Sequence, residues 1–158
     1  MIIEKLSLST ADSALELCSI LKSNDEHPCS FWGYSEASIL NLIESENCIA
    51  LVSKLNEKVT GIGVLSQGGK FQNHWAEISV AIHPDFRKLG FAKKLVSALE
   101  EYQTALNIEF IKALILENNR ASRDFFANSG YEHKATLYKD FKSEKHGNLN
   151  DCVYYKIF

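Results

Sequence analysis

The stretch His83–Val96, HPDFRKLGFAKKLV, constrains the fold more than any other part of the sequence. It follows Trp75–Ile82 (WAEISVAI), a run rich in residues that favour β-strands. Pro84 cannot donate a hydrogen bond to a neighbouring strand, so the strand is expected to end there. The residues after the turn predict an amphipathic helix whose apolar stripe recurs at helical spacing: Ala92, Leu95, Val96, Leu99, Tyr102 and Leu106.

The short turn between this strand and this helix has the composition of an anion site. The first amides of a helix lack intrahelical partners, and together with the helix dipole they favour a negative charge. Gly90 has no Cβ, and Ala92 is nearly as small, so a ligand can approach the backbone closely. Four basic residues surround the turn: Arg87, Lys88, Lys93 and Lys94. The turn predicts a diphosphate site, with a plain strand-to-helix connection and solvated lysines as the alternative. It matches neither the P-loop nor the GxGxxG spacing.

The segments on either side extend this unit into an α/β fold. Phe110–Leu116 is nearly continuous apolar sequence, which predicts a strand covered on both faces. It should run parallel to Trp75–Ile82 through a right-handed crossover. Ala121–Asn128 predicts a short helix that Gly130 ends. Further strands are expected at Ile2–Leu8, Cys48–Leu55, Val59–Leu65, Tyr131–Phe141 and Asp151–Phe158, and further helices after Ser9–Asp12 and Ser35–Ser38. The order predicts a mixed, mostly antiparallel sheet with a central parallel β-α-β unit and flanking helices.

Length and composition predict one globular domain spanning residues 1–158. The formal net charge of −3 and the lack of a long basic stripe argue against a nucleic-acid partner. No apolar run approaches the ~20 residues that span a bilayer, and the N-terminus lacks a signal-peptide core, so we expect a cytoplasmic protein without a membrane partner. The four cysteines form no CxxC pair and the histidines lie at no ligand spacing from them, so reduced thiols and no metal site are expected.

Two motifs resemble those of the GNAT superfamily of acetyl-CoA-dependent N-acetyltransferases. Val80–Ala92 (VAIHPDFRKLGFA) is similar to its acyl-CoA signature, Arg/Gln-x-x-Gly-x-Gly/Ala, with Arg87, Gly90 and Ala92 at the defining positions. Asn119–Tyr131 resembles a second pattern, Asn-x-x-Ala/Ser-x-x-Phe-Tyr-x-x-x-Gly-Phe. The two motifs, with the strands between them, cover roughly the second half of the chain. The resemblance implies a GNAT-like fold and transfer of an acetyl group from acetyl-CoA to a primary amine of a small molecule, amino acid or protein N-terminus. Homodimers are common in this family.

The resemblance also implies where the co-substrate acetyl-CoA binds. Its diphosphate would lie on the turn formed by Arg87, Lys88, Leu89, Gly90, Phe91, Ala92 and Lys93. Its pantetheine arm would follow the strand edge at Val80, Ala81 and Ile82, where free main-chain groups can pair with the arm's amides. An amide near Ile82 would stabilise the oxyanion. Asn119 would hydrogen-bond near the arm or only cap the following helix, and Phe126 would pack against the arm.

Two proton transfers remain for this reaction. Glu77, on the central strand, is the expected base that deprotonates the amine through water, unless it is only a solvated or ion-paired strand residue. Family members often use a tyrosine as the acid at the position of Phe126, which has no proton to give. Tyr131, Tyr138 or solvent would then serve, or the thiolate would leave unaided, since a thiol has a pKa of about 8.5.

The acceptor is expected between the N-terminal helices and the last hairpin. The predicted lining residues are Glu26, His27, Phe31, Trp32 and Tyr34, with aromatic side chains that fill the core as the alternative. Asp151 is similar to a tail position in relatives that act on small amines or amino acids. Two other functions stay open: a non-catalytic acyl-CoA-binding sensor, for which Phe126 argues, and an O-acyltransferase or a user of longer acyl chains.

Overall fold

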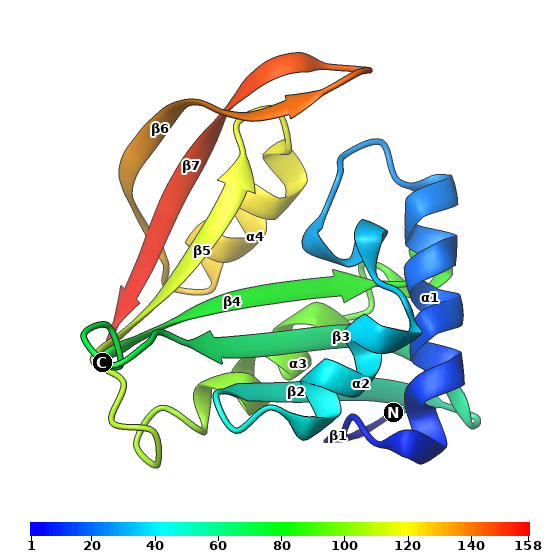
Figure 1. Cartoon of the computed structure of the whole chain (residues 1–158). Helices are drawn as coiled ribbons and strands as arrows, with labels where there is room; N and C mark the ends of the chain where they lie inside the picture. Colours follow the sequence, from blue (N-terminus) through cyan, green and yellow to red (C-terminus); the bar gives the residue numbers. More distant parts are fainter.

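The computed structural model describes residues 1–158 and shows one sheet with helices on both faces (Figure 1). The strands are β1 (Ile2–Lys5), β2 (Cys48–Leu55), β3 (Lys58–Gln67), β4 (Trp75–Ile82), β5 (Phe110–Leu116), β6 (Glu132–Ser143) and β7 (Gly147–Ile157). The helices are α1 (Ala11–Asn24), α2 (Glu36–Glu44), α3 (Phe91–Glu100) and α4 (Arg120–Asn128), with 3-10 turns η1 (Leu8–Thr10), η2 (Ser30–Gly33) and η3 (Pro84–Phe86).

The sheet topology confirms the predicted fold class. The seven strands lie in the order β1-β2-β3-β4-β5-β7-β6. Only β4 and β5 run parallel, joined by the crossover through α3, and every other neighbouring pair is antiparallel. None of the helices combines the length and the apolar character needed to cross a membrane.

Two hydrophobic cores lie on opposite faces of the sheet. Helices α3 and α4 cover one face, where Leu95, Leu99 and Phe126 are buried against the strands. Helices α1 and α2 and the η2 turn cover the other face, where Leu17 and Phe31 are buried. Each fully buried leucine contributes roughly 1.5–3 kcal/mol relative to an exposed one. The side chains of β4 therefore alternate between two different packing environments.

The helices of the second half begin and end as their local sequences dictate. The Asn119 side chain caps α4 by accepting a hydrogen bond from the Ser122 amide at 3.2 Å. Gly130 follows the helix with φ of +88°, a conformation that glycine adopts without strain. The Tyr131 amide then donates to the Phe126 carbonyl at 3.0 Å, which completes a Schellman-type end. This part of the second motif therefore has a structural role at both ends of α4.

Every predicted strand and helix is present, but several bounds differ from the prediction, most of all that of the last strand, which begins at Gly147 instead of Asp151. The strands at Trp75–Ile82 and Phe110–Leu116 have the predicted bounds, and the first strand ends at Lys5, earlier than expected. Helix α3 ends at Glu100, where bonds between residues three apart tighten the chain, so Tyr102 and Leu106 pack on the core from a turn. The expectation that β5 is covered on both faces is wrong at Leu114, which is 37% exposed.

Candidate functional site

A gap opens in the middle of the sheet because β4 and β5 diverge. Their pairing ends at Glu77 and Lys112, although β4 continues to Ile82. The His83 amide donates to Thr60 of β3 at 2.8 Å, and the His74 carbonyl accepts from Glu109 at 2.7 Å. Odd-numbered residues of β4 therefore turn their main chain toward β3, and even-numbered residues turn theirs toward β5. Beyond the last pair, the amides of Val80 and Ile82 face the gap without a β5 partner.

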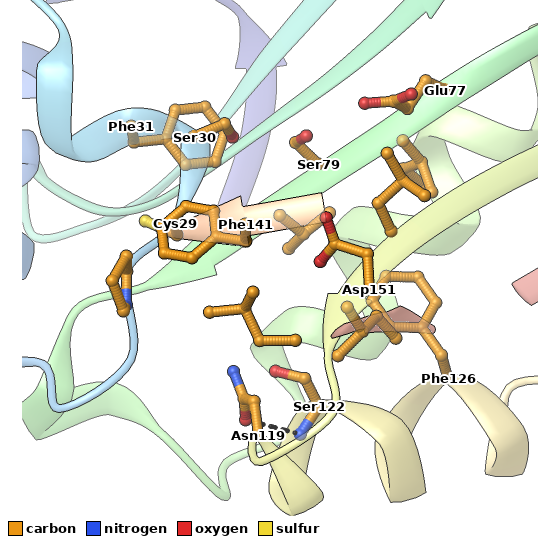
Figure 2. Close-up of a pocket in the computed structure, with 16 residues that line it drawn as sticks. Cys29, Ser30, Phe31, Glu77, Ser79, Asn119, Ser122, Phe126, Phe141 and Asp151 are labelled. Carbon is orange, nitrogen blue, oxygen red and sulfur yellow. Dashed lines mark hydrogen bonds between the residues drawn. The ribbon is translucent and has the colours of Figure 1, made fainter. Parts of the chain in front are cut away.

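A cavity of about 290 Å³ occupies this gap (Figure 2). The odd-numbered side chains Glu77 and Ser79 lie on the α1 face of the sheet, and Ile78 and Val80 lie on the α3 face. The cavity thus passes through the sheet and has two halves. We call the α3-side half the coenzyme half and define it by Ile78, Val80, Ile115, Asn119, Ser122 and Phe126. We call the α1-side half the acceptor half and define it by Pro28, Cys29, Ser30, Phe31, Glu77, Ser79, Leu114, Leu116, Phe141 and Asp151.

The turn before α3 presents a row of unpaired main-chain donors. No acceptor in the protein binds the amides of residues 88–93, and the first bonded amide after them is that of Lys94, to the Gly90 carbonyl. Lys88 and Gly90 have φ values of +62° and +80°, so the chain curls and successive amides turn toward one side. A Cβ built on Gly90 would meet no atom within 4 Å. These donors and the open space fit an anion of two phosphates.

The turn is held in place by His83 and Arg87. Buried His83 accepts a hydrogen bond from the Asp85 amide at its Nδ1, 3.2 Å away, and packs edge-on against Phe86. Arg87 donates from Nε to the Ile82 carbonyl at 3.0 Å and from Nη2 to the Asp25 carboxylate at 2.6 Å. The guanidinium thus ties the turn to the end of α1, so it is not free to add its charge to the anion site as the sequence suggested.

Removing this tie is expected to cost stability more than coenzyme affinity. Arg87→Ala leaves the largely buried Asp25 carboxylate without its partner and should lower the free energy of unfolding by about 1–2 kcal/mol. The affinity for acetyl-CoA should fall less than about 10-fold, because the unpaired amides remain. Urea unfolding and calorimetric titration measure the two quantities. A loss of affinity above 100-fold without loss of stability would show that Arg87 binds the phosphates directly.

Two carboxylates are the only charged side chains that line the cavity, and both lie in the acceptor half. Glu77 is ion-paired with Lys112 of β5, with Nζ 3.1 Å from Oε2, and this pairing is compatible with either of its expected roles. Asp151 of β7 forms no ion pair with a basic side chain, and its side-chain hydrogen-bond contact is with another acid, Asp140 of β6. Burial raises the pKa of the Asp151 carboxyl, and the neighbouring Asp140 carboxylate and then Glu77 raise it further.

The coenzyme half contains no obvious acid for the departing thiolate. Phe126 lines it, and Ser122 lies one turn earlier on the same face of α4 (Figure 2). Tyr131 is buried outside the cavity, where its hydroxyl donates to Glu100 at 3.0 Å and burial raises its pKa. Tyr138 lies on β6 and is 77% exposed. Neither tyrosine lines the cavity, so neither of these two expected substitutes is within the site.

The loop between α1 and α2 borders the acceptor half, but not through all the predicted residues. Phe31 lines the cavity, together with Pro28, Cys29 and Ser30, which the sequence did not single out. Burial raises the pKa of the Cys29 thiol. The other predicted residues lie outside the cavity: Glu26, which is exposed, and His27, Trp32 and Tyr34. Tyr34 packs edge-on against Phe31, so the aromatic side chains largely fill the core beneath the loop.

Of the strand and turn residues expected to hold acetyl-CoA, some lie in the cavity or have free main-chain groups, and others are bonded within the protein. Val80 lines the cavity, whereas Ala81 turns its main chain to β3 and the Ile82 carbonyl is bonded to Arg87. The residues from Lys88 to Lys93 form the turn already described. Asn119 caps α4 and also lines the coenzyme half, so both of its expected roles are compatible with its position.

A bulge in β6 brings further residues to the acceptor half. The pairing register with β7 shifts between Leu137 and Phe141, and Lys139 within the bulge has φ of +50°. Its amide donates to the Asn150 side chain at 2.8 Å, which fixes the distortion beside Asp151. The register shift places Phe141 opposite Leu149, and Phe141 lines the cavity. The alternating tail predicted strands here, but no local signal marks a bulge.

The structure contains no group of three or more His, Cys, Asp or Glu side chains arranged to hold a metal ion.

Comparisons with known proteins agree with this geometry. A family model described as "Acetyltransferase (GNAT) family" matches residues 17–131. An acetyltransferase of Yersinia pestis (strain Pestoides F) is 26% identical over 106 residues, which cover 67% of this chain and 73% of the relative. A match to an acetyltransferase of Yersinia enterocolitica has the same identity and coverage.

Solved structures resemble the whole chain at low sequence identity. A ribosomal-protein-alanine N-acetyltransferase from Brucella melitensis superposes with a TM-score of 0.88 at 18% identity and covers 100% of both chains. A Salmonella typhimurium protein described as an acetyltransferase with its cofactor acetyl-CoA superposes with a TM-score of 0.85 at 18% identity, covering 99% of this chain and 92% of that one. At this identity the likeness shows a shared fold.

Proposed function

Because the chain belongs to the GNAT family of acetyltransferases, we propose that it transfers an acetyl group from acetyl-CoA to a primary amine. The proposal depends mainly on one observation: the turn with free amides and the cavity lie next to each other along β4. The unpaired amides of residues 88–93 lie at the end of β4, and the cavity begins where β4 leaves β5. A coenzyme with a diphosphate at one end and a thioester at the other matches this arrangement.

The residues of the coenzyme half suit the parts of acetyl-CoA that would lie there. The donors of the turn bind the diphosphate, with Lys88 and Lys93 as nearby positive charges. The free amides of Val80 and Ile82 pair with the pantetheine arm as a missing strand would. One of them also donates to the acyl oxygen as negative charge develops there. Acetyl-CoA supplies the activated acetyl group as a thioester.

The acceptor half suits an amine that attacks the thioester through the gap in the sheet. An ammonium ion has no lone pair, so it must lose a proton before attack. The acceptor half holds two carboxylates that could take this proton, Glu77 and Asp151. Its apolar walls exclude water from the reacting atoms, and Phe31 and Phe141 supply much of that surface.

An amine screen tests the proposed function. Purified protein is incubated with acetyl-CoA and a panel of polyamines, amino acids, amino sugars and peptides, and free thiol is measured. We expect thiol release above the hydrolytic background with at least one amine, and a product heavier by one acetyl group. The same panel with hydroxyl compounds distinguishes an O-acyltransferase.

A second function, a non-catalytic acyl-CoA-binding module, is favoured by Phe126. This residue lines the coenzyme half where family members often carry a tyrosine acid. Tight acetyl-CoA binding without thiol release for any acceptor would support this second function and contradict the first.

Restoring a phenol at this position should speed the reaction. Phe126→Tyr introduces a group with a pKa near 10 that can protonate the departing thiolate. We expect kcat to rise by roughly two- to tenfold, because a thiolate already leaves well, and the acetyl-CoA affinity to stay constant. Steady-state kinetics and calorimetry measure the two effects.

The matched control for this variant is Phe125→Tyr, which adds the same hydroxyl on the same helix outside the cavity. It should leave kcat unchanged. An unchanged kcat in Phe126→Tyr as well would mean that thiolate protonation does not limit turnover.

A further inference from the structure

We propose that Asp151, rather than Glu77, is the carboxylate that receives the acceptor's ammonium group and takes its proton. This inference rests on the proposed acetyl transfer to an amine. It also defines the acceptor class, a cationic primary amine that carries no carboxylate beside the reacting nitrogen.

The position of Asp151 follows from the strand register. Asp151 pairs with Leu116 of β5 and with Leu137 of β6, so its side chain lies on the α1 face of the sheet with Leu116. It lines the acceptor half and projects into the cavity between Ser79 and Phe126 (Figure 2). It is therefore at the place where an amine entering from the α1 face would meet the gap between β4 and β5.

The two carboxylates differ in their partners. Lys112 binds Glu77 at 3.1 Å, and its Nζ also lies 4.3 Å from the centre of the Trp75 ring, which holds it there. Asp151 has no cationic partner, and its side-chain hydrogen-bond contact is with a second acid, Asp140. A substrate ammonium would have to compete with Lys112 at Glu77, whereas at Asp151 it would supply a charge that is missing.

The groups around Asp151 favour its protonated form. Asp140 approaches it from β6 and Glu77 acts on it from β4, and both are acidic. Lys112 of β5 is already paired with Glu77, and the Cys29 thiol of the loop has a pKa raised by burial, so it is neutral. With burial as the largest cause, the pKa of Asp151 is raised, which makes it a better proton acceptor than an ordinary aspartate.

The proton balance of the step is simple. The ammonium gives one proton to the Asp151 carboxylate, and the freed nitrogen lone pair forms a bond to the acetyl carbon. The bond between that carbon and the CoA sulfur breaks, and its electrons leave with the sulfur. The second proton lost by the nitrogen goes to the thiolate directly or through water, and Asp151 returns its own proton to solvent. The products are the acetylated amine and free CoA.

The charge of the acceptor half limits the acceptors it can take. Its only charged lining residues are carboxylates, and neither of the two can pair with an acid group on the substrate. The carboxylate of a free amino acid would lie within a few ångströms of Asp151 and repel it. Amines formed by decarboxylation of amino acids, and polyamines, carry the same ammonium without this cost.

Single substitutions separate the two carboxylates. Asp151→Asn keeps the shape of the side chain and removes the base. We expect kcat/KM to fall at least ~100-fold. The acidic limb of its pH profile should disappear and acetyl-CoA affinity should change less than about threefold.

Three other variants serve as comparisons. Glu77→Gln should keep the acidic limb of the pH profile, because Asp151 is still present. Asp140→Asn removes a charge that raises the pKa of Asp151, so the acidic limb of the pH profile of this variant should move to lower pH. Asp124→Asn, an exposed residue of α4, is the unchanged control.

A stability measurement separates loss of function from loss of folding. The pKa of Asp151 is raised in the folded state, so the folded protein binds this proton more tightly than the unfolded chain does. The stabilisation from protonation is complete below the pKa that Asp151 has in the unfolded chain, and it is lost as the pH rises through the pKa that Asp151 has in the folded protein. Asp151→Asn should therefore raise the thermal midpoint at pH 8 while activity falls. The inference is overturned if Glu77→Gln abolishes the acidic limb and Asp151→Asn keeps it, or if Asp151→Asn retains full activity.

Matched substrates test the acceptor class. Tyramine is compared with tyrosine and histamine with histidine, each pair differing only by a carboxylate beside the single primary amine. We expect higher kcat/KM for the amine of each pair that reacts. A preference for the amino acids would overturn the inferred class and leave the proposed acetyl transfer intact. If none of the amines in the wider panel caused thiol release, the proposed function would instead be overturned.

Discussion

Replacing Gly90 by glutamate is expected to lower the affinity for acetyl-CoA at least ~100-fold, or about 2.7 kcal/mol. The position is open, since a Cβ there meets no atom within 4 Å, and it adjoins the unpaired amides of residues 88–93. A glutamate side chain would enter the space proposed for the diphosphate and add a negative charge beside it. Calorimetric titration with acetyl-CoA measures the loss.

The control for this variant must reproduce its backbone strain. Gly90 has φ of +80°, where any side chain is disfavoured, and a folding defect alone could reduce binding. Gly147, the first residue of β7 after the β6–β7 turn, has φ of +68° and equally open surroundings. Gly147→Glu makes the same charge change with similar strain and should bind acetyl-CoA normally. If Gly90→Glu also bound with unchanged affinity, the diphosphate site would be elsewhere.

Filling the acceptor half is expected to abolish transfer while coenzyme binding survives. Ser79→Phe projects a ring from β4 into a cavity of about 290 Å³, on the α1 face of the sheet. The ring should displace the acceptor, so that acetyl transfer falls at least ~100-fold, a loss of about 2.7 kcal/mol in transition-state stabilisation. The amides of the turn lie outside this half, so the acetyl-CoA affinity should change less than about threefold.

The variant Ser79→Ala separates the volume of the new ring from the loss of the hydroxyl. It should keep most of the activity, because the Ser79 side chain makes no hydrogen bond in the protein. Thermal unfolding of both variants checks that the sheet is intact. If Ser79→Phe abolished acetyl-CoA binding as strongly as Gly90→Glu does, the division of the cavity into two halves would be wrong.

The fold could be predicted from the sequence because its signals are local. The alternation in β4, the helical spacing in α1 and α3 and the Gly130 helix end each depend on residues within a few positions of one another. The turn before α3 is equally local, since Pro84, Gly90 and the helix start sit in one short segment. Its free amides follow from the geometry of any helix N-terminus.

The site chemistry could be predicted only in part because it depends on partners distant in sequence. Arg87 looked like a phosphate ligand, yet it pairs with Asp25, 62 positions away. The sequence left Glu77 open as a base or as an ion-paired strand residue, and the parallel register sets it beside Lys112. The loop between α1 and α2 borders the cavity through Phe31, whereas Trp32 and Tyr34 lie outside the cavity and pack on the core.

The sequence by itself determined the order of elements, the donor-rich turn and the family of the chain, since each is written in short-range periodicity and in motifs of adjacent residues. The tertiary structure alone decided which carboxylate lacks a cationic partner, which side chains of β4 line each side of the cavity and which residue of β6 reaches it. The physical reason is that charge pairing and burial depend on strand register and splay, which distant segments set together.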